Sequence, residues 1–247
     1  MQNPLTPGQI AELKSFDTCL IADAIESLGI RLRNEGFPTW GVRCLFKNLP
    51  PLVGYAVTCK IRSADPPAVG SRYEERTDWW KHIASIPAPR VVAMQDVDRP
   101  PGIGAFFGKV HAHVLMALGC VGVITNGGAR ELPAIEAAGF QVFAGRIAVS
   151  RAYVHIVEFG GPVEFDGLTV KPGDLIHGDR HGFLTVPQEL ALELPSLARV
   201  IEKKKQNLID LSRKPGTPHE ELRRGLKELF EFNHIPLVME QNGEKDK

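Results

Sequence analysis

The residues best placed to do chemistry lie in "TNGGARELPAIEAAG" at positions 125–139. An apolar run precedes this stretch and a helical pattern follows it, so N–H groups at the helix start could bind a carboxylate or phosphate. Arg130 adds a planar guanidinium that suits bidentate carboxylate binding, whereas Glu131 would oppose an anion unless it held a divalent cation. The turn alone favours a simpler interpretation, in which Glu131 complements its helix dipole and Arg130 is a surface or subunit-contact residue.

A second glycine-opened helix is expected upstream, in "GIGAFFGKVHAHVLMALG". Gly108 opens it, so the N–H groups of Lys109, Val110 and His111 could form another anion-binding terminus that faces the first across one crevice. His111 and His113 point in different directions on a helix, which makes them poor joint metal ligands. They are predicted to be helix-surface histidines.

The stretch "HGDRHG" offers an alternative site. His177, Asp179 and His181 alternate, and on one face of a strand they could hold zinc or iron. The flanking Gly178 and Gly182 instead favour consecutive tight turns in which aspartate is the turn-forming residue. The sequence therefore predicts tight turns in this segment.

Two acids follow the β-branched run "RVVAM". Asp96 and Asp98 are expected just beyond the carboxyl end of a strand, where ligands bind in α/β sheets. Either could orient a metal-bound water or simply cap the following loop. The next stretch, "RPPGIGAFFG", is too rich in proline and glycine to continue a strand.

The elements that position these residues alternate between strand and helix. Residues 126–129 read as a turn, the strand at 52–62 as half-buried, and the chain after residue 147 as hairpins. We expect helices over 7–28 (two short or one broken), 74–85, 109–118, 130–138, 187–213 and 218–232, and strands over 52–62, 90–96, 120–125 and 140–144. This order predicts a layered α/β architecture with parallel or mixed pairing, followed by a frayed polar tail.

Composition excludes several classes of protein. Among 247 residues, 29 Lys and Arg balance 29 Asp and Glu, so no global field attracts nucleic acid or a membrane. The basic run at 199–214 reads as the solvated side of an amphipathic helix. Four cysteines without CxxC spacing and no apolar run of about 18 residues predict a soluble cytoplasmic protein. Nucleotide-binding glycine motifs are absent from the sequence.

Four segments together resemble the RraA-like family, which includes regulators of ribonuclease E activity and 4-hydroxy-4-methyl-2-oxoglutarate aldolases. They are "CLIADAIESLG", "LVGYAVT", "FGKVHAHVLMALGCVGVITNGGARE" and "GPVEFDGLTVKPGDLIHGDRHGFLTVP". The resemblance implies a swivelling-type α/β domain with mixed sheets over residues 1–187 and a C-terminal helical extension over 188–247. It also implies a homotrimer or dimer of trimers with active sites at subunit interfaces.

The resemblance assigns roles to the same residues that the turn chemistry singled out. The backbone from Gly108 to His111, together with Arg130, would hold a pyruvyl carboxylate, and Glu131 would bind Mg²⁺ or Mn²⁺. The leading expectation is therefore a divalent-metal-dependent carbon-carbon lyase, an aldolase or oxaloacetate decarboxylase, that releases pyruvate from a small 2-oxo acid. Asp96 would orient a metal-bound water.

Three positions depart from the family pattern. Glu131 stands where the family usually has aspartate, Lys109 where it often has an acid, and Ala134 where an acid is common. Lys109 would either strengthen binding of a second carboxylate or weaken metal affinity. The alternative expectation is a non-catalytic regulator that binds a protein partner such as a ribonuclease.

Overall fold

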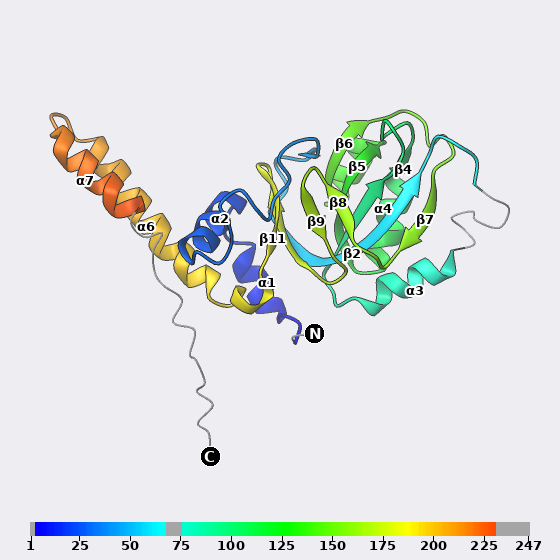
Figure 1. Ribbon diagram of the computed structural model, residues 1–247, viewed down its shortest axis with the longest axis horizontal. Coiled ribbons are helices and arrows are strands. Elements are labelled where there is room, and N and C mark those ends of the chain that lie inside the picture. Colours follow the sequence, from blue (N-terminus) through cyan, green and yellow to red (C-terminus); the bar gives the residue numbers. More distant parts are fainter. Residues whose placement is uncertain (1–2, 68–75, 231–247) are drawn as a thin grey trace, which may run out of the picture.

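The main feature of the fold is a nine-stranded mixed sheet that is nearly closed on itself. The computed structural model describes residues 3–67 and 76–230. The main path of the sheet runs β1-β6-β5-β3-β2-β10-β11, with β4 paired to β5 and β7 paired to β2. The central strands β2, β3, β5 and β6 are parallel, so their carboxyl ends meet at one edge. A separate hairpin, β8-β9, lies against the sheet (Figure 1).

The helices and strands follow the order expected from the sequence, except for two short strands at 43–44 and 105–107 that were not predicted. The strands are β1 Arg43–Cys44, β2 Leu52–Arg62, β3 Arg90–Asp96, β4 Ala105–Phe107, β5 Cys120–Ala129, β6 Gln141–Ile147, β7 His155–Phe159, β8 Val163–Phe165, β9 Leu168–Val170, β10 Leu175–Asp179 and β11 Gly182–Val186. The helices are α1 Pro7–Leu13, α2 Thr18–Ser27, α3 Thr77–Ser85, α4 Lys109–Ala117, α5 Leu132–Ala137, α6 Leu194–Ser212 and α7 His219–Phe230, with a short 3₁₀ turn, η2 Gln188–Leu190. The layered α/β prediction is confirmed.

Local sequence signals explain where the first helices begin. Thr6 caps α1 through a reciprocal capping box with Gln9, and Pro7 occupies the first helical position. Asp17 caps α2 by accepting the N–H of Leu20 at 2.7 Å. The prediction of two short helices over 7–28 is therefore confirmed.

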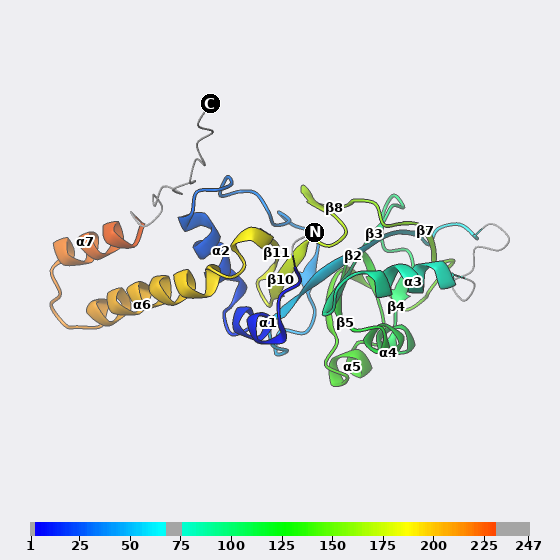
Figure 2. The ribbon, with the colours of Figure 1, turned by 90° about the horizontal axis from the view of Figure 1, so that it is seen from below.

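Apolar side chains cover both faces of the main sheet. Alternate residues of β2 enter two core clusters, Val57 on the side of the helices and Ala56 on the side of the β8-β9 hairpin. Figure 2 shows α4 and α5 next to each other on the helix side. The polar positions of β2 predicted a half-buried strand. This prediction is wrong, since Thr58 is fully buried. The β8-β9 hairpin covers the face that the alternation had assigned to solvent.

Two other local predictions are corrected by strand pairing. Residues 126–129 are not a turn, because β5 continues to Ala129 and pairs with both β4 and β6. A Cβ at Gly128 would lie 3.0 Å from the Gly104 carbonyl oxygen, so glycine here permits close strand approach rather than chain reversal. The stretch after Asp96 also returns to a strand, β4, despite its prolines and glycines.

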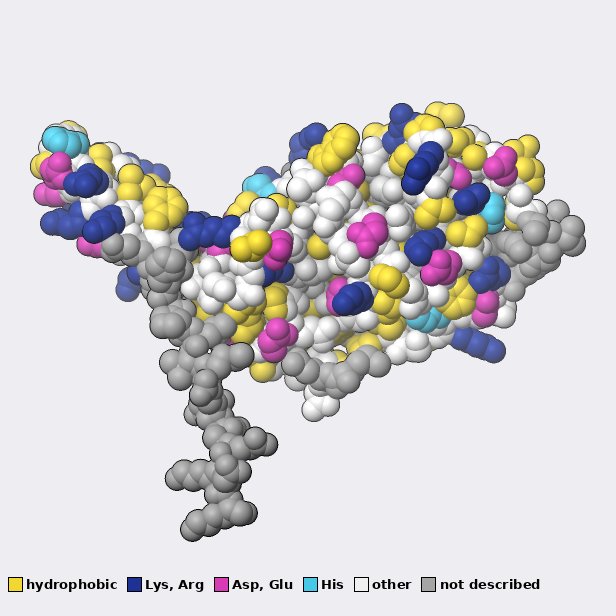
Figure 3. Space-filling model, in the orientation of Figure 1, with side chains coloured by type: hydrophobic (Ala, Val, Ile, Leu, Met, Phe, Trp, Pro, Cys, Tyr) yellow, Lys and Arg dark blue, Asp and Glu magenta, His cyan; other side chains and the backbone are white. Residues whose placement is uncertain are grey.

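The C-terminal helices form an arm that projects from the body (Figure 1). The first half of α6 belongs to the main core through Leu194, Ala198 and Ile201. Beyond it, Lys205 pairs with Asp23 of α2, and α7 has no buried residue. Figure 3 shows basic side chains along this arm. The domain boundary expected after residue 187 stays a prediction.

Some expectations fall on residues outside the described ranges. The first residues of the helix expected at 74–85, the end of the helix expected at 218–232 and the polar tail belong to that group. None of the helices in the described part of the chain is both long and apolar enough to cross a membrane.

The packing between the sheet and the β8-β9 hairpin should contribute measurably to stability. Phe143 of β6 is fully buried there, 5.7 Å from the ring of Phe183. Phe143→Ala is expected to lower the free energy of unfolding by about 3 to 5 kcal/mol, because it leaves a cavity in a packed core. Urea unfolding would measure the loss. Phe230→Ala is the matched control, since Phe230 is 63% exposed, and an equal loss there would contradict this prediction.

Candidate functional site

The candidate site lies at the carboxyl edge of the parallel strands, where β4 and β5 end side by side. Phe107 of β4 pairs with Ala129 of β5, and the Arg130 N–H donates to the Phe107 carbonyl at 3.0 Å. This pairing brings Gly108, the first residue before α4, next to Arg130 and Glu131. The two helix starts predicted to share one crevice are therefore neighbours.

Glu131 joins these two helix starts through its side chain. Its backbone is left-handed, with φ 56° and ψ 36°, and its carboxylate makes no cap on its own helix α5. Instead Oε2 accepts the backbone N–H of Lys109, the first residue of α4, at 3.1 Å. A Cβ on Gly108 would lie 2.4 Å from that oxygen, so glycine leaves the space that the carboxylate fills. The Glu131 side chain thus forms no hydrogen-bonded cap on its own helix and supplies an acceptor to α4.

Arg130 contains a buried donor without a partner. Its Nε has no hydrogen bond among the described residues, and the side chain lies beside the Gly108 backbone. A buried donor left unpaired costs about 1 to 3 kcal/mol, and more when it is charged. An anion bound at the start of α4 would supply the missing acceptor.

The other residues expected to bind substrate form the first turn of α4. Lys109 and Val110 are exposed, and the Lys109 Nζ lies 3.9 Å from Glu131 Oε1. The helix-surface description holds for His113 but not for His111, whose ring packs against Phe106 with centroids 5.0 Å apart. Burial, and then the charge of Arg151, lower the pKa of His111 to about 4.

The carboxylates of Asp96 and Asp98 accept hydrogen bonds from backbone N–H groups of loops and do not point into open solvent. Asp96 is 2% exposed and accepts the N–H groups of Gly102 at 2.7 Å and Asp98 at 3.0 Å. Asp98 accepts the Ser63 N–H at 2.6 Å, and hydrogen bonds of this kind lower its pKa against the opposing effect of burial. Of the two roles weighed for these acids, the contacts support capping of the following loop for Asp96, whereas Asp98 binds the backbone of Ser63 and Ala64 after β2.

The alternative metal site at "HGDRHG" is not formed. The fully buried His177 bonds Thr18 Oγ1 at 3.0 Å and the Leu13 carbonyl at 3.1 Å, so both ring nitrogens have protein partners. Asp179 accepts the N–H groups of Thr18 and His181. The segment is the end of β10 and a tight turn into β11, as the turn chemistry predicted.

The residues around Glu131 do not fit the divalent cation that the resemblance implies. Mg²⁺ can be held by one carboxylate with waters and substrate, but here one Glu131 oxygen accepts a backbone N–H and the other faces the Lys109 ammonium. Lys109 adds a positive charge beside this carboxylate, and Arg130 adds a second one at the preceding position of the chain. In the described ranges, no cluster of three His, Cys, Asp or Glu residues could hold a metal. The local charge suits an anion.

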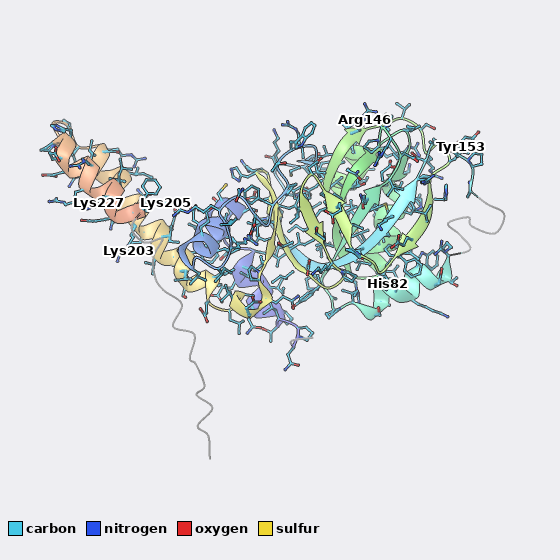
Figure 4. The ribbon with its side chains drawn as sticks, in the orientation of Figure 1. His82, Arg146, Tyr153, Lys203, Lys205 and Lys227 are labelled. Atoms are coloured by element: carbon cyan, nitrogen blue, oxygen red, sulfur yellow. The ribbon has the colours of Figure 1, made fainter. Side chains whose placement is uncertain are left out.

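An exposed apolar rim borders the site. Ala148 follows β6 and donates to the Ala129 carbonyl at 3.0 Å, which places the end of β6 against the end of β5. The rim residues are Ile103, Val110, Ile147, Val149 and Tyr153, which are 45%, 56%, 68%, 93% and 54% exposed. Figure 4 shows Tyr153 toward the end of the body remote from the arm and Arg146 on its upper side. Exposed apolar side chains that lie near one another are typical of contact surfaces.

Sequence reasoning missed two parts of this edge. The Asn126 side chain bonds both the N–H and the carbonyl of Asp96, at 2.7 and 2.9 Å, and so ties β5 to the end of β3. The rim was missed because residues 147–153 read only as the entrance to hairpins. The apolar residues Ile147 and Val149, two apart after a buried strand, were the available signal.

The protein is thus of the α/β class, with a cationic site at the carboxyl edge of its parallel strands. The family model described as RraA-like, Aldolase/RraA, matches residues 18–185. The chain therefore belongs to the RraA-like family, as the resemblance indicated.

Similar proteins support the same fold. An uncharacterised protein from Pseudomonas syringae pv. tomato superposes with a TM-score of 0.69 at 24% identity, covering 91% of this chain and 96% of that one. Streptomyces coelicolor RraAS2, described as an unusual member of the RNase ES inhibitor RraA protein family, has a TM-score of 0.64 at 17% identity, with 82% and 97% covered.

Two sequence relatives have a comparable level of identity. Protein DlpA of Legionella pneumophila is 24% identical over 197 residues, which is 78% of this chain but only 30% of the Legionella protein. Protein MJ0644 of Methanocaldococcus jannaschii is 24% identical over 174 residues, covering 69% of this chain and 77% of that protein.

The lowered pKa of His111 predicts a pH-dependent loss of stability. Between pH 6.5, near the ordinary histidine pKa, and about pH 4, the unfolded chain takes up a proton that the folded protein does not. Stability therefore falls as pH falls, by up to about 1.4 kcal/mol per pH unit for one such group. Chemical unfolding of His111→Gln between pH 4 and 7 should show a shallower dependence.

His113→Gln is the matched control, since His113 is exposed on the same helix. Its dependence on pH should equal that of the wild type. The fully buried His177 has a pKa lowered by burial as well, so a residual slope is expected in both variants. An unchanged slope in His111→Gln would contradict the assignment.

Proposed function

We propose that this chain is a carbon-carbon lyase that cleaves a small 2-oxo acid and releases pyruvate, as an aldolase, an oxaloacetate decarboxylase or both. The observation that carries the proposal is the buried Nε of Arg130, which has no hydrogen-bond partner among the described residues and belongs to a side chain beside Gly108. The Arg130 guanidinium and the N–H groups at the start of α4 would offer positively polarised donors to a bound carboxylate. Family membership supports the class, because the family model is described as Aldolase/RraA.

The chemistry requires a place for the negative charge that develops on the keto oxygen. Breaking the bond between carbons 3 and 4 sends its electron pair into a carbon-carbon double bond, which gives the enolate of pyruvate. Arg130 would hold the carboxylate, and donors at the start of α4 would face the keto oxygen as its charge increases. Carbon 3 then takes a proton from water.

The metal-dependent form expected from the sequence would place Mg²⁺ or Mn²⁺ on Glu131. The charges around Glu131 argue against this position, so the proposed mechanism assigns the stabilisation of the enolate to cations of the chain itself.

The proposal includes a homo-oligomer. The apolar rim of Ile103, Val110, Ile147, Val149 and Tyr153 borders the site, and covering it with a second subunit would remove apolar surface from water. The same contact would lower water access to the site, which strengthens electrostatic interactions within it.

A second candidate function is a regulator that binds a protein partner. The arm favours it, since α7 buries no residue and Leu226 and Phe230 remain 47% and 63% exposed. In that case partner binding would survive Arg130→Ala and be lost when Leu226 and Phe230 are replaced by serine. Interaction with a candidate ribonuclease would be measured by calorimetry.

Arg130→Ala should lower kcat/KM for pyruvate release by about a hundredfold or more, because losing a charge-assisted pair costs about 3 kcal/mol. Pyruvate would be measured by a coupled assay on oxaloacetate and a panel of 4-hydroxy-2-oxo acids, with spontaneous decarboxylation subtracted. The control Arg223→Ala removes a mainly exposed arginine from α7 and should leave the rate unchanged. If the wild type releases no pyruvate from any of these acids, with or without Mg²⁺ or Mn²⁺, the proposed function is wrong.

A further inference from the structure

We infer that the Lys109 ammonium supplies the positive charge that a divalent cation would supply in a metal-dependent lyase, so that this site works without a metal. The inference rests on the proposed function. The resemblance implies a divalent cation at Glu131, but the charges around Glu131 do not suit one.

The position of Glu131 is the first argument. Its carboxylate already bonds the Lys109 N–H at 3.1 Å and occupies the space above Gly108. The other carboxylate oxygen, Oε1, does not take part in that hydrogen bond, and the Lys109 Nζ lies 3.9 Å from it. The Lys109 ammonium thus faces the Glu131 oxygen that a bound cation would use.

The exposure of the pair is the second argument. The Lys109 side chain is 57% exposed and that of Glu131 is 27% exposed. A long, flexible lysine in this setting can turn from Glu131 toward a ligand without leaving a buried charge behind. Glu131, by contrast, is fixed by its backbone conformation and its hydrogen bond to α4. The lysine is therefore the movable partner.

The charge of the site is the third argument. A divalent cation at Glu131 would be repelled by both Lys109 and Arg130, and the repulsion increases with the product of the charges. A 2-oxo acid has the opposite preference, since its carboxylate meets Arg130 and its keto oxygen can meet Lys109. The same two side chains that disfavour a metal thus favour the substrate.

The reaction balances without a metal. As the bond between carbons 3 and 4 breaks, its electron pair forms the enolate, and the leaving fragment departs as carbon dioxide or as a carbonyl compound. In the aldol case, the hydroxyl proton of the substrate passes to water. The Lys109 ammonium donates a hydrogen bond to the enolate oxygen, and water returns a proton to carbon 3.

Metal-stripped wild-type protein tests this directly. Oxalate, a stable mimic of the pyruvate enolate, would be titrated by calorimetry with and without Mn²⁺, and the same mixtures would be titrated into buffer to correct for chelation. We expect oxalate to bind the metal-free protein, with no gain in affinity when Mn²⁺ is added. Electron paramagnetic resonance should show that Mn²⁺ alone stays free in the presence of the protein.

Substitutions at Lys109 sharpen the test. Lys109→Met keeps most of the length of the unbranched side chain but removes the charge, and it should weaken oxalate binding by about tenfold or more. Lys109→Asp places a second carboxylate beside Glu131 and should create Mn²⁺ binding that the wild type lacks. The matched control Lys203→Met alters an exposed lysine on the arm (Figure 4) and should change neither measurement.

The outcomes separate this inference from the proposed function. If oxalate binds the wild type only together with Mn²⁺, the inference is wrong and the proposed lyase stands. If Mn²⁺ alone binds the wild type and Glu131→Gln abolishes that binding, the inference is also wrong. If oxalate binds under neither condition and no pyruvate is released, both fail. The oxalate and Mn²⁺ measurements on the wild type test the inference even if a Lys109 variant does not fold.

Discussion

Both faces of the main sheet are covered by apolar packing, and the rest of the structure depends on this constraint. Strands β2, β3 and β5 send alternate side chains to the helices on one face and to the β8-β9 hairpin on the other. An unpaired charge in the middle of such strands would be strongly destabilising. Charged groups therefore collect where the parallel strands end, and Asp96 and Arg130 both lie there.

At that edge, one carboxylate connects two elements that are distant in the chain. Glu131 begins α5 but caps α4, and it adopts a left-handed backbone that costs a non-glycine residue about 1 to 3 kcal/mol. The cost is tolerated because Gly108 leaves room for the carboxylate and the first N–H of α4 gains an acceptor. The same contact sets the charge of the site, since it brings Lys109 to Glu131.

Local sequence signals predict much of the secondary structure. Thr6, Pro7 and Asp17 mark helix starts by their own backbone chemistry, and the β-branched runs mark β2, β3 and β5 to within a few residues. The predictions failed where neighbouring strands decide the outcome. Gly127 and Gly128 form a turn in many sequences, yet here they extend β5 because β4 and β6 pair with it at close range.

The sequence by itself determined most of the order of elements and the two helix starts that contain Gly108 and Arg130, because hydrophobic periodicity and capping are local properties. The family was indicated separately, by the resemblance of four segments. Only the tertiary structure decided how Glu131 is used, that His111 is partly buried and that an apolar rim borders the site. Those features depend on which strands pair and which surfaces they cover. Distances between residues such as 109 and 131 are set by the pairing of β4 with β5, which no local pattern encodes.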